Sequence, residues 1–275
     1  MNNFTKRLLS GCVYALLMLA GAAFHPVLFV VIYGVLLFFT QFEFYNLVEK
    51  AGSSPRKITG LSVGMLLFLV CFGMVNNLLP AKSFLLFIPA LTFIFLYEVF
   101  SDKNAILQNS AVTFTGFIYV AIPFSLLNFI VYPGYPAIAE YSPSILIGVL
   151  FIIWVYDTTA YLSGTAFGKH KINKKISPNK SWEGVIGGTT AALIMGTLNS
   201  VIFAEYEIMN WLIISILTVI FGTLGDLFES VIKRRINVKD SGTILPGHGG
   251  LLDRLDSLLF VIPVVYVWLI FSGNL

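Results

Sequence analysis

Charged and hydroxyl side chains recur at helical spacing in the last quarter of the chain. Asp226, Glu229, Ser230 and Lys233 would form one stripe if the apolar segment before them continues as a helix. Glu229 and Lys233, four residues apart, can then form an ion pair, which by itself indicates only a structural role. Asp226 has no cation at its neighbouring helical positions. It therefore needs either a distant cationic side chain or a bound metal ion.

A second carboxylate pair, Asp253 and Asp256, lies three residues apart at the expected start of the last helix. Like charges this close repel each other unless a cation lies between them. Oxygen ligands without a His/Cys cluster favour Mg²⁺ over zinc, because Mg²⁺ takes one or two carboxylates plus substrate phosphates. We therefore predict Asp226 and Asp253 as metal ligands, with Arg254 on a phosphate oxygen. The alternative is that the second pair only caps a helix start.

An earlier polar stretch, residues 157–181, has a different composition. Asp157 and Tyr161 share a helical face, and Asp157 follows an apolar run at membrane depth, where a carboxylate costs about 2.5–3.5 kcal/mol and is usually functional. Ser177-Pro178 breaks the chain before the next helix, whose first amides could bind an anion. Ammonium groups in such a stretch suit a polyphosphate, or they are only the charges of a solvated loop. These lysines are Lys169, Lys171, Lys174, Lys175 and Lys180.

A glycine-rich turn precedes the last helix. The run Pro246-Gly247-His248-Gly249-Gly250 is typical of a tight turn whose amides are available to an anion. His248 is a lone histidine, for which a phosphate contact and a loop-shaping hydrogen bond both remain open.

Composition identifies the elements that must position these residues. Of 275 residues, 57% are hydrophobic and only 11% charged, with a mean hydropathy of +0.86, whereas soluble domains carry about 25% charged residues. We predict an all-α polytopic membrane protein, because backbone in hydrocarbon must be hydrogen-bonded internally. Both cysteines lie in apolar runs, which argues against a disulfide framework. About nine spans are expected, at 8–23, 27–40, 58–75, 84–97, 111–131, 145–156, 185–203, 211–225 and 258–271.

The basic residues predict the topology. With a cytoplasmic N-terminus, every one of the 17 lysines and arginines except Lys82 falls in cytoplasmic segments, and the C-terminus lies outside. The two long cytoplasmic loops are then 157–181 and 226–257. We accordingly divide the chain into residues 1–145, transmembrane helices for structure and lipid access, and residues 146–275, a catalytic transmembrane region.

The stretch from Ser230 to Asp256 resembles the phosphatidate cytidylyltransferase (CDP-diacylglycerol synthase) family. The matching positions are Ser230, Lys233-Arg234, Lys239-Asp240, Gly242, Pro246, His248-Gly249-Gly250 and Asp253-Arg254-Leu255-Asp256. The earlier stretch is similar to the family's second region at Asp157, Ala160-Tyr161, Gly164, Gly168, Ser177-Pro178, Lys180 and Glu183-Gly184. The resemblance covers roughly the last 120 residues, and the first 150 match only in general character.

The resemblance implies CTP and phosphatidic acid as substrates, Mg²⁺ dependence and release of pyrophosphate. It places a two-cation site on Asp226 and Asp253, with a monovalent second cation left open. The residues expected in catalysis are Asp226, Asp253, Asp256, Lys233 and Arg254. The residues expected to bind substrate are Asp157, Tyr161, Ser177, Lys180, Glu183, Ser230, Arg234, Lys239, Asp240, His248, Gly249 and Gly250.

Other functions remain open at this point. A CTP-dependent polyprenol kinase or another lipid cytidylyltransferase would use the same nucleotide, and an anion or nucleotide transporter would also place charges within membrane helices. We expect a multi-pass protein of the inner (plasma) membrane with its active site at the cytoplasmic face. The expected partners are CTP, phosphatidic acid and the bilayer, with no nucleic-acid polymer. A homodimer is left open.

Overall fold

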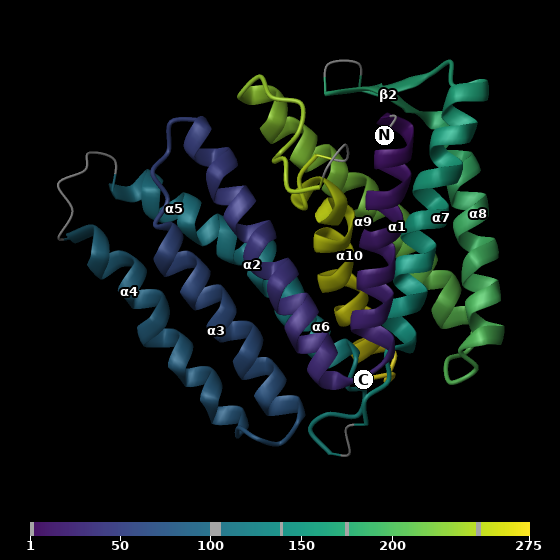
Figure 1. The fold of residues 1–275 in the computed structure, drawn as a ribbon. Helices are drawn as coiled ribbons and strands as arrows, with labels where there is room; N and C mark the ends of the chain where they lie inside the picture. The colour runs from purple at the N-terminus through teal and green to yellow at the C-terminus, as the bar shows by residue number, and fades with distance from the viewer. Residues whose placement is uncertain (1–2, 100–105, 138–139, 174–175, 246–248) are drawn as a thin grey trace.

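The computed structural model describes residues 3–99, 106–137, 140–173, 176–245 and 249–275. Within these ranges, seven helices are long and apolar enough to cross a membrane, and two shorter apolar helices accompany them. The all-α polytopic class is thereby confirmed, and the described helices match the nine expected spans. The two ends of the chain lie at opposite ends of the helix bundle (Figure 1). Which end faces the cytoplasm stays a prediction.

The first half of the chain begins with a tight helical hairpin. His25 caps α2, because its Nδ1 accepts a hydrogen bond from the N–H of Val27 at 3.1 Å, and Pro26 occupies the first turn, where its missing N–H costs nothing. Further along, a π-helical turn lies just before Pro123, which cannot donate its own helical hydrogen bond. The elements are α1 (Asn3–Ala23), α2 (Pro26–Lys50), α3 (Lys57–Val75), η1 (Ala81–Leu86), α4 (Phe87–Val99), α5 (Ile106–Gly116), η2 (Phe117–Ala121) and α6 (Ile122–Ile130).

The second half carries longer helices than its apolar runs suggest. Its elements are α7 (Ser144–Phe167), β1 (Lys171–Asn173), β2 (Ser177–Ser181), α8 (Trp182–Ile202), α9 (Ile208–Arg235) and α10 (Leu252–Phe271). The expected loop boundaries at 157 and 226 are therefore wrong. Both positions lie inside helices, because the backbone continues its helical hydrogen bonds after the side chains become polar. This also confirms that the stripe from Asp226 to Lys233 is helical.

A short antiparallel hairpin interrupts the helical pattern before α8. In β1 and β2, Lys171 pairs with Ser181 and Asn173 pairs with Ser177. Ser177-Pro178 thus lies in a strand and does not directly precede the helix, as the sequence suggested. Instead Ser181 is the N-cap of α8, and its Oγ accepts a hydrogen bond from the N–H of Gly184 at 3.2 Å.

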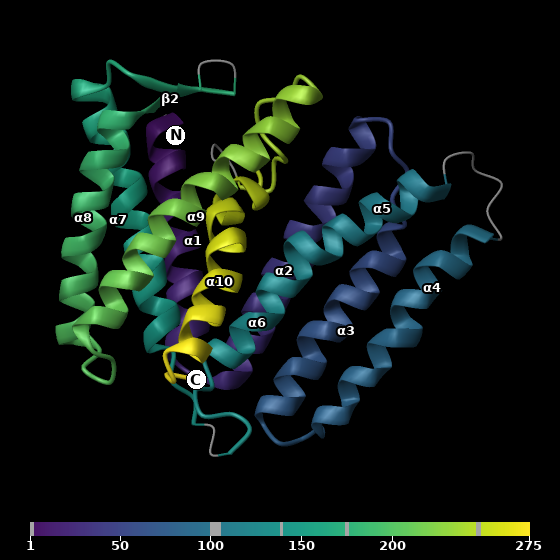
Figure 2. The ribbon, with the colours of Figure 1, turned by 180° about the vertical axis from the view of Figure 1, so that it is seen from behind.

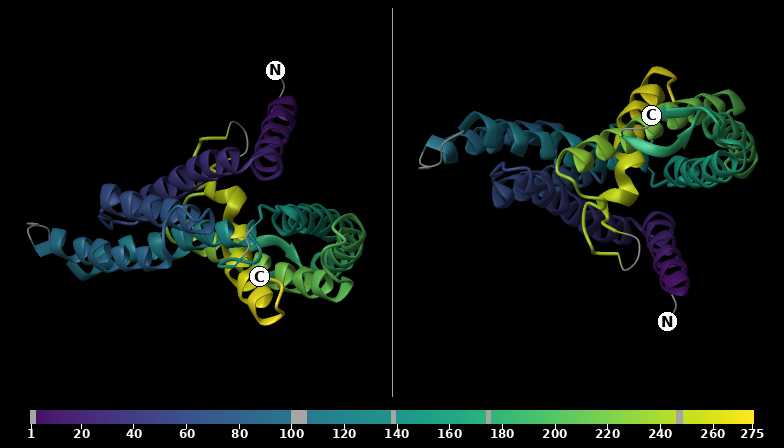
Figure 3. Two further views of the ribbon diagram at one scale, coloured as in Figure 1. Left: turned by 90° about the horizontal axis from the view of Figure 1, so that it is seen from below. Right: turned by 90° about the horizontal axis from the view of Figure 1, so that it is seen from above.

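The helices form two arms with α10 between them. Seen along the bundle, α3 to α5 make one arm and α7 to α9 the other (Figure 3). The two arms meet where α10 packs against α2 and α6 on one side and against α7 and α9 on the other. From behind, α9 crosses obliquely beside α10 (Figure 2). Helix α1 packs on α2 and on α7.

Close packing between α7 and α8 sets the position of the hairpin. A Cβ added at Gly184 would lie 2.7 Å from the carbonyl oxygen of Ala160 and 3.3 Å from the Cα of Gly164. The two backbones can approach this closely because glycine has no side chain, a packing mode typical of membrane helices. The start of α8 is consequently held against the end of α7, with Ser181 beside Gly164 and Lys180 close enough to Asp157 for their charges to interact.

Candidate active site

A cavity of about 620 Å³ lies at the hairpin end of the bundle. It is lined from α1, α7, β2, α8, α9 and α10, so all three helices of the α7–α9 arm contribute to it. Five carboxylates and three cationic side chains line it, which leaves an excess of negative charge if all are ionised. These residues are Asp157, Asp226, Glu229, Asp253 and Asp256, with Lys180, Lys233 and Arg254. The predicted residues Tyr161 and Ser177 line it as well.

One ion pair joins the hairpin to α9. Lys180 Nζ lies 2.6 Å from Oδ2 of Asp226, and both side chains are partly open to the cavity, at 24% and 36% exposure. Ser230, one helical turn along α9, donates a hydrogen bond from its Oγ to Oδ1 of the same aspartate at 3.2 Å. The distant cation that the sequence required for Asp226 is therefore Lys180. Because this pair is half-exposed, it can exchange its partners when other charges enter the cavity.

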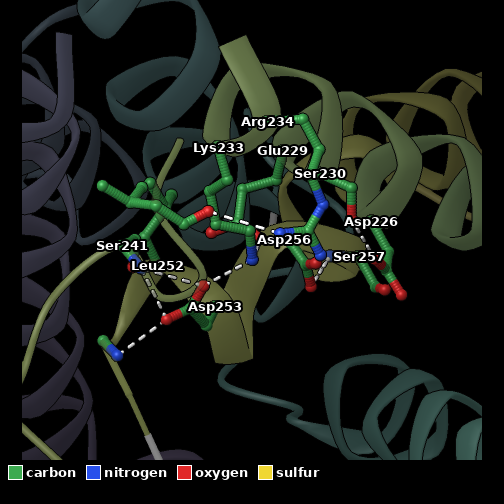
Figure 4. A network of polar contacts seen from close by, with 12 residues as sticks. Asp226, Glu229, Ser230, Lys233, Arg234, Ser241, Leu252, Asp253, Asp256 and Ser257 are labelled. Atoms are coloured by element: carbon green, nitrogen blue, oxygen red, sulfur yellow. Dashed lines mark hydrogen bonds and ion pairs between the residues drawn. The ribbon is translucent and has the colours of Figure 1, made fainter. Parts of the chain in front are cut away.

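A second, buried network joins α9 to α10 (Figure 4). Lys233 Nζ lies 2.5 Å from Oε2 of Glu229 and 2.6 Å from Oδ1 of Asp253. The Glu229 side chain is fully buried, and those of Lys233 and Asp253 are 11% and 9% exposed. The predicted helical pair of Glu229 and Lys233 is thus confirmed, but Lys233 also holds Asp253. One ammonium between two carboxylates is a strong local constraint at low dielectric.

Backbone amides complete the surroundings of Asp253. The N–H of Ser241 donates to Oδ2 at 2.9 Å, and the N–H of Gly250 donates to the same oxygen at 2.8 Å. Gly249 adopts a φ of +81°, which places it in the left-handed region, and its carbonyl accepts from the N–H of Leu245 at 3.0 Å. The glycine-rich turn therefore supplies the Gly250 amide to Asp253 in this structure. The sequence predicts the amides of this turn for an anion, and the anion that the Gly250 amide binds here is a protein carboxylate.

The Asp256 carboxylate lies near both the Lys180–Asp226 pair and the Lys233 network. Asp256 is buried, and it lies close enough to Asp226, Asp157 and Lys233 for their charges to interact. Its Oδ1 accepts a hydrogen bond from the N–H of Ser257 at 2.6 Å. Four aspartates therefore converge on the cavity from three helices. Their convergence could not be read from sequence spacing, because Asp157 comes from α7.

The donor set suits a hard divalent cation. Carboxylate oxygens are the ligands that Mg²⁺ prefers, and the cavity carries more negative than positive charge. In the part of the chain that the structure describes, no three His, Cys, Asp or Glu side chains are already gathered as a metal-ligand cluster. Both predicted metal ligands are held by lysines, Asp226 by Lys180 and Asp253 by Lys233. The residues fit such an ion in type and charge, and Asp226, whose pair with Lys180 is partly exposed, can exchange this partner for the ion.

Several predicted residues do not line the cavity. Glu183 accepts from the His170 ring, with Nδ1 and Oε1 2.7 Å apart. Arg234 donates to the carbonyls of Ile176 and Val238, at 3.3 and 3.4 Å, so it links the hairpin to the end of α9. Lys239 and Asp240 are exposed in the loop that follows α9. His248 lies outside the described residues.

Sequence reasoning missed contributions from the first half of the chain. Ser10, Gly11 and Tyr14 of α1 line the cavity, and the Tyr14 hydroxyl donates to the carbonyl of Arg254 at 3.2 Å. No feature of the α1 sequence predicts this. Glu43 of α2 accepts from the first amide of α10, and here a signal existed, because a carboxylate within an apolar helix is costly.

The chain is similar to known proteins over nearly its whole length. Residues 5–272 match the model of the cytidylyltransferase family. A phosphatidate cytidylyltransferase of Staphylococcus saprophyticus is 39% identical over 240 residues, covering 86% of this chain and 87% of that protein. One from Staphylococcus aureus is 41% identical over 186 residues, covering 66% and 68%, and one from Haemophilus influenzae is 46% identical over 124 residues, covering 43% of each. With the match extending over nearly the whole chain, this protein belongs to the cytidylyltransferase family.

Proposed function

We propose that this protein is a phosphatidate cytidylyltransferase, which converts CTP and phosphatidic acid into CDP-diacylglycerol and pyrophosphate. The observation that carries the proposal is the cavity, where four aspartates and three cationic side chains meet at one end of a bundle of membrane helices. The names of the relatives support the same reaction. A site at the end of membrane helices lets a lipid keep its acyl chains in the bilayer while its headgroup reacts.

The cationic residues are assigned to the phosphates. Lys180 and Arg254 line the cavity, and ammonium and guanidinium groups form strong charge-assisted hydrogen bonds with phosphate oxygens. Lys180 is the better candidate for a mobile contact, because its pair with Asp226 is partly exposed. Tyr161 and Ser177 supply hydroxyl groups at the cavity wall.

The acidic residues are assigned to a cation. We propose that Asp226 and Asp253 hold Mg²⁺, with Asp256 and Asp157 close enough to add to the negative potential. When bound, such an ion offsets the charge on attacking and leaving phosphate oxygens. A monovalent second cation remains part of the proposal. The buried network around Lys233 keeps the Asp253 carboxylate in place before any ion arrives.

The chemical step is a direct displacement. An oxygen of the phosphatidic acid phosphate attacks the α-phosphorus of CTP, and the bond from that phosphorus to the oxygen bridging the β-phosphate breaks. Pyrophosphate leaves with the bond electrons, and the cytidylyl group stays on the lipid phosphate. No covalent enzyme intermediate is needed, because a phosphomonoester is an adequate nucleophile once it is positioned. Lys180 and Arg254 would steady the departing pyrophosphate.

We propose that the cavity faces the cytoplasm from the inner (plasma) membrane. The ends of α2 and α9 and the starts of α3 and α10 at the cavity end carry Lys50, Lys57, Arg56, Lys233, Arg234, Arg235 and Arg254, whereas Lys82 lies in η1 at the other end. Basic residues are enriched on the cytoplasmic side of membrane proteins. CTP would then reach the site from the compartment that contains it. A homodimer stays a prediction.

A labelling experiment tests the proposal. The full chain, purified in detergent, is incubated with phosphatidic acid, Mg²⁺ and CTP labelled either at the α- or at the γ-phosphorus. We expect the α-label in a CDP-lipid and the γ-label in pyrophosphate. A kinase would transfer the γ-label to the lipid and release CDP. Transport of CTP into proteoliposomes without any lipid product would contradict the proposal and favour a transporter.

A further inference from the structure

The first half of the chain sends one carboxylate to the edge of the active site. Glu43 on α2 is 3% exposed, and its Oε2 accepts a hydrogen bond from the N–H of Leu252 at 2.9 Å. Leu252 is the first residue of α10, and the first N–H groups of a helix have no acceptor within the helix. The positive end of the helix dipole also favours a carboxylate there. Among the described residues, no lysine, arginine or histidine forms an ion pair with Glu43.

Two glycines close around this carboxylate. A Cβ added at Gly242 would overlap Oε1 of Glu43, and one added at Gly250 would lie 2.5 Å from its Oε2. Gly242 lies near the middle of the segment between α9 and α10, and Gly250 lies near its end. Because neither position has room for a side chain, the backbone at both glycines is in direct contact with Glu43.

The same two backbone stretches also hold Asp253. Ser241, which precedes Gly242, donates its N–H to Asp253, and Gly250 donates its own N–H to the same oxygen. The backbone at Ser241–Gly242 and at Gly250 therefore lies between two carboxylates. Glu43 contacts it from the α2 side, and Asp253 accepts its amides from the α10 side.

We propose that Glu43 is a positioning residue for the cytidylyl transfer, because it fixes the amides that orient the Asp253 carboxylate. The proposal rests on the proposed function, in which Asp253 belongs to the reacting centre. Glu43 is not among the residues that line the cavity. A small displacement of Asp253 changes the catalytic geometry, and reactions of positioned groups are sensitive to shifts of about 1 Å. The N-terminal helices thus support the site as well as surrounding it.

A purely architectural role makes a different prediction. If Glu43 only anchors α2 to α10, its replacement lowers stability but leaves the turnover of the folded protein unchanged. If Glu43 positions Asp253, turnover falls in molecules that remain folded, while the Michaelis constant for CTP, set by other residues, changes little. The two roles are therefore separated by kcat and by exchange of the Ser241 amide, which bonds Asp253.

The experiment compares Glu43→Gln with Gln41→Met. Gln41 is a matched control, since it is buried on the same helix but bonds Tyr45 and the carbonyl of Gly60, away from Asp253. For Glu43→Gln in the full chain we expect kcat to fall at least about tenfold, with the Michaelis constant for CTP within about twofold. Gln41→Met should keep kcat near the unmodified value. Glu43→Asp, which retains the charge, replaces the Gln variant if that variant does not fold, and it should show the same kcat loss in smaller degree.

Hydrogen exchange gives a readout independent of the proposed function, and a double-mutant cycle tests the contact between Glu43 and Gly242. Peptides covering Ser241 and Leu252 should exchange faster in Glu43→Gln than in Gln41→Met, whatever the protein catalyses. Gly242→Ala alone should lower kcat strongly, because the added Cβ overlaps the Glu43 carboxylate. Combined with Glu43→Ala, which removes that carboxylate, the same substitution should lower kcat little further. Unchanged kcat in Glu43→Gln, whether or not exchange changes, or additive effects in the cycle, would overturn the proposal. Altered exchange in a protein that forms no CDP-lipid would instead contradict the proposed function alone.

Discussion

Two ion-pair assemblies share one cavity and differ mainly in burial. The Lys180–Asp226 pair is 24% and 36% exposed, whereas in the Glu229–Lys233–Asp253 network one lysine holds two carboxylates at 11% exposure or less. Each assembly pairs a lysine with an aspartate, and the second adds Glu229. Exposed pairs contribute little to stability because water and salt screen them, but losing one partner of a buried group leaves an uncompensated charge. Burial thus assigns a mobile role to the first assembly and a structural role to the second.

The largest expected effect tests the buried network. Lys233→Met leaves Glu229 and Asp253 buried without their cation, so we expect the free energy of unfolding to drop by about 3–5 kcal/mol. Turnover should be lost at the same time, because Asp253 is no longer held. Chemical unfolding in detergent micelles measures the first effect. Lys57→Met is the matched control, since Lys57 pairs with Glu49 at 2.5 Å with 24% and 55% exposure, and it should cost less than about 1 kcal/mol. Equal losses of unfolding free energy in the two variants would show that burial does not decide how much these ion pairs stabilise the protein.

Asp226→Asn tests the mobile assembly. The substitution preserves shape and removes one charge from a partly exposed site, so the free energy of unfolding should change by less than about 1 kcal/mol. Turnover should nevertheless fall about 10²–10³-fold, the usual cost of removing one group that stabilises transition-state charge. The measurements are CDP-lipid formation at saturating CTP and Mg²⁺, and unfolding of the same preparation. Full activity in this variant would refute the assignment of Asp226 to a cation.

Lys180→Met should have an intermediate effect. If Lys180 leaves Asp226 to contact the triphosphate, its removal should raise the Michaelis constant for CTP about tenfold, as expected for the loss of one charge-assisted hydrogen bond. Stability should stay within about 1 kcal/mol, since the pair is exposed. Initial rates over a range of CTP concentrations measure the effect. An unchanged Michaelis constant would place Lys180 outside the nucleotide site.

The smallest expected effect concerns Ser230. Its hydroxyl makes one hydrogen bond of 3.2 Å to Asp226. A hydrogen bond to a charged group contributes about 1.5–3 kcal/mol, and exposure to water lowers this contribution. Because Asp226 is partly exposed, water can replace the hydroxyl in Ser230→Ala. We therefore expect turnover to fall only a few-fold and stability to be unchanged. A loss as large as that of Asp226→Asn would show that Ser230 has a role of its own.

Much of the architecture followed from local pattern. Long apolar runs indicated the membrane helices, and helical spacing alone paired Glu229 with Lys233. The helix ends were less predictable, because hydrophobicity marks where a membrane span ends and carries no information on where the backbone hydrogen bonds stop. Asp157 and Asp226 were accordingly expected at loop boundaries and lie within α7 and α9.

The sequence by itself therefore determined the fold class, the stripe on α9 and the acidic start of α10, since each depends on residues a few positions apart. Only the tertiary structure decided that Lys180 is the partner of Asp226, that Lys233 also binds Asp253, and that Glu43 reaches Leu252 across 209 residues. Ion pairs and helix caps between distant segments depend on how the helices cross. That geometry arises from the packing of many side chains together, and no single local pattern contains it.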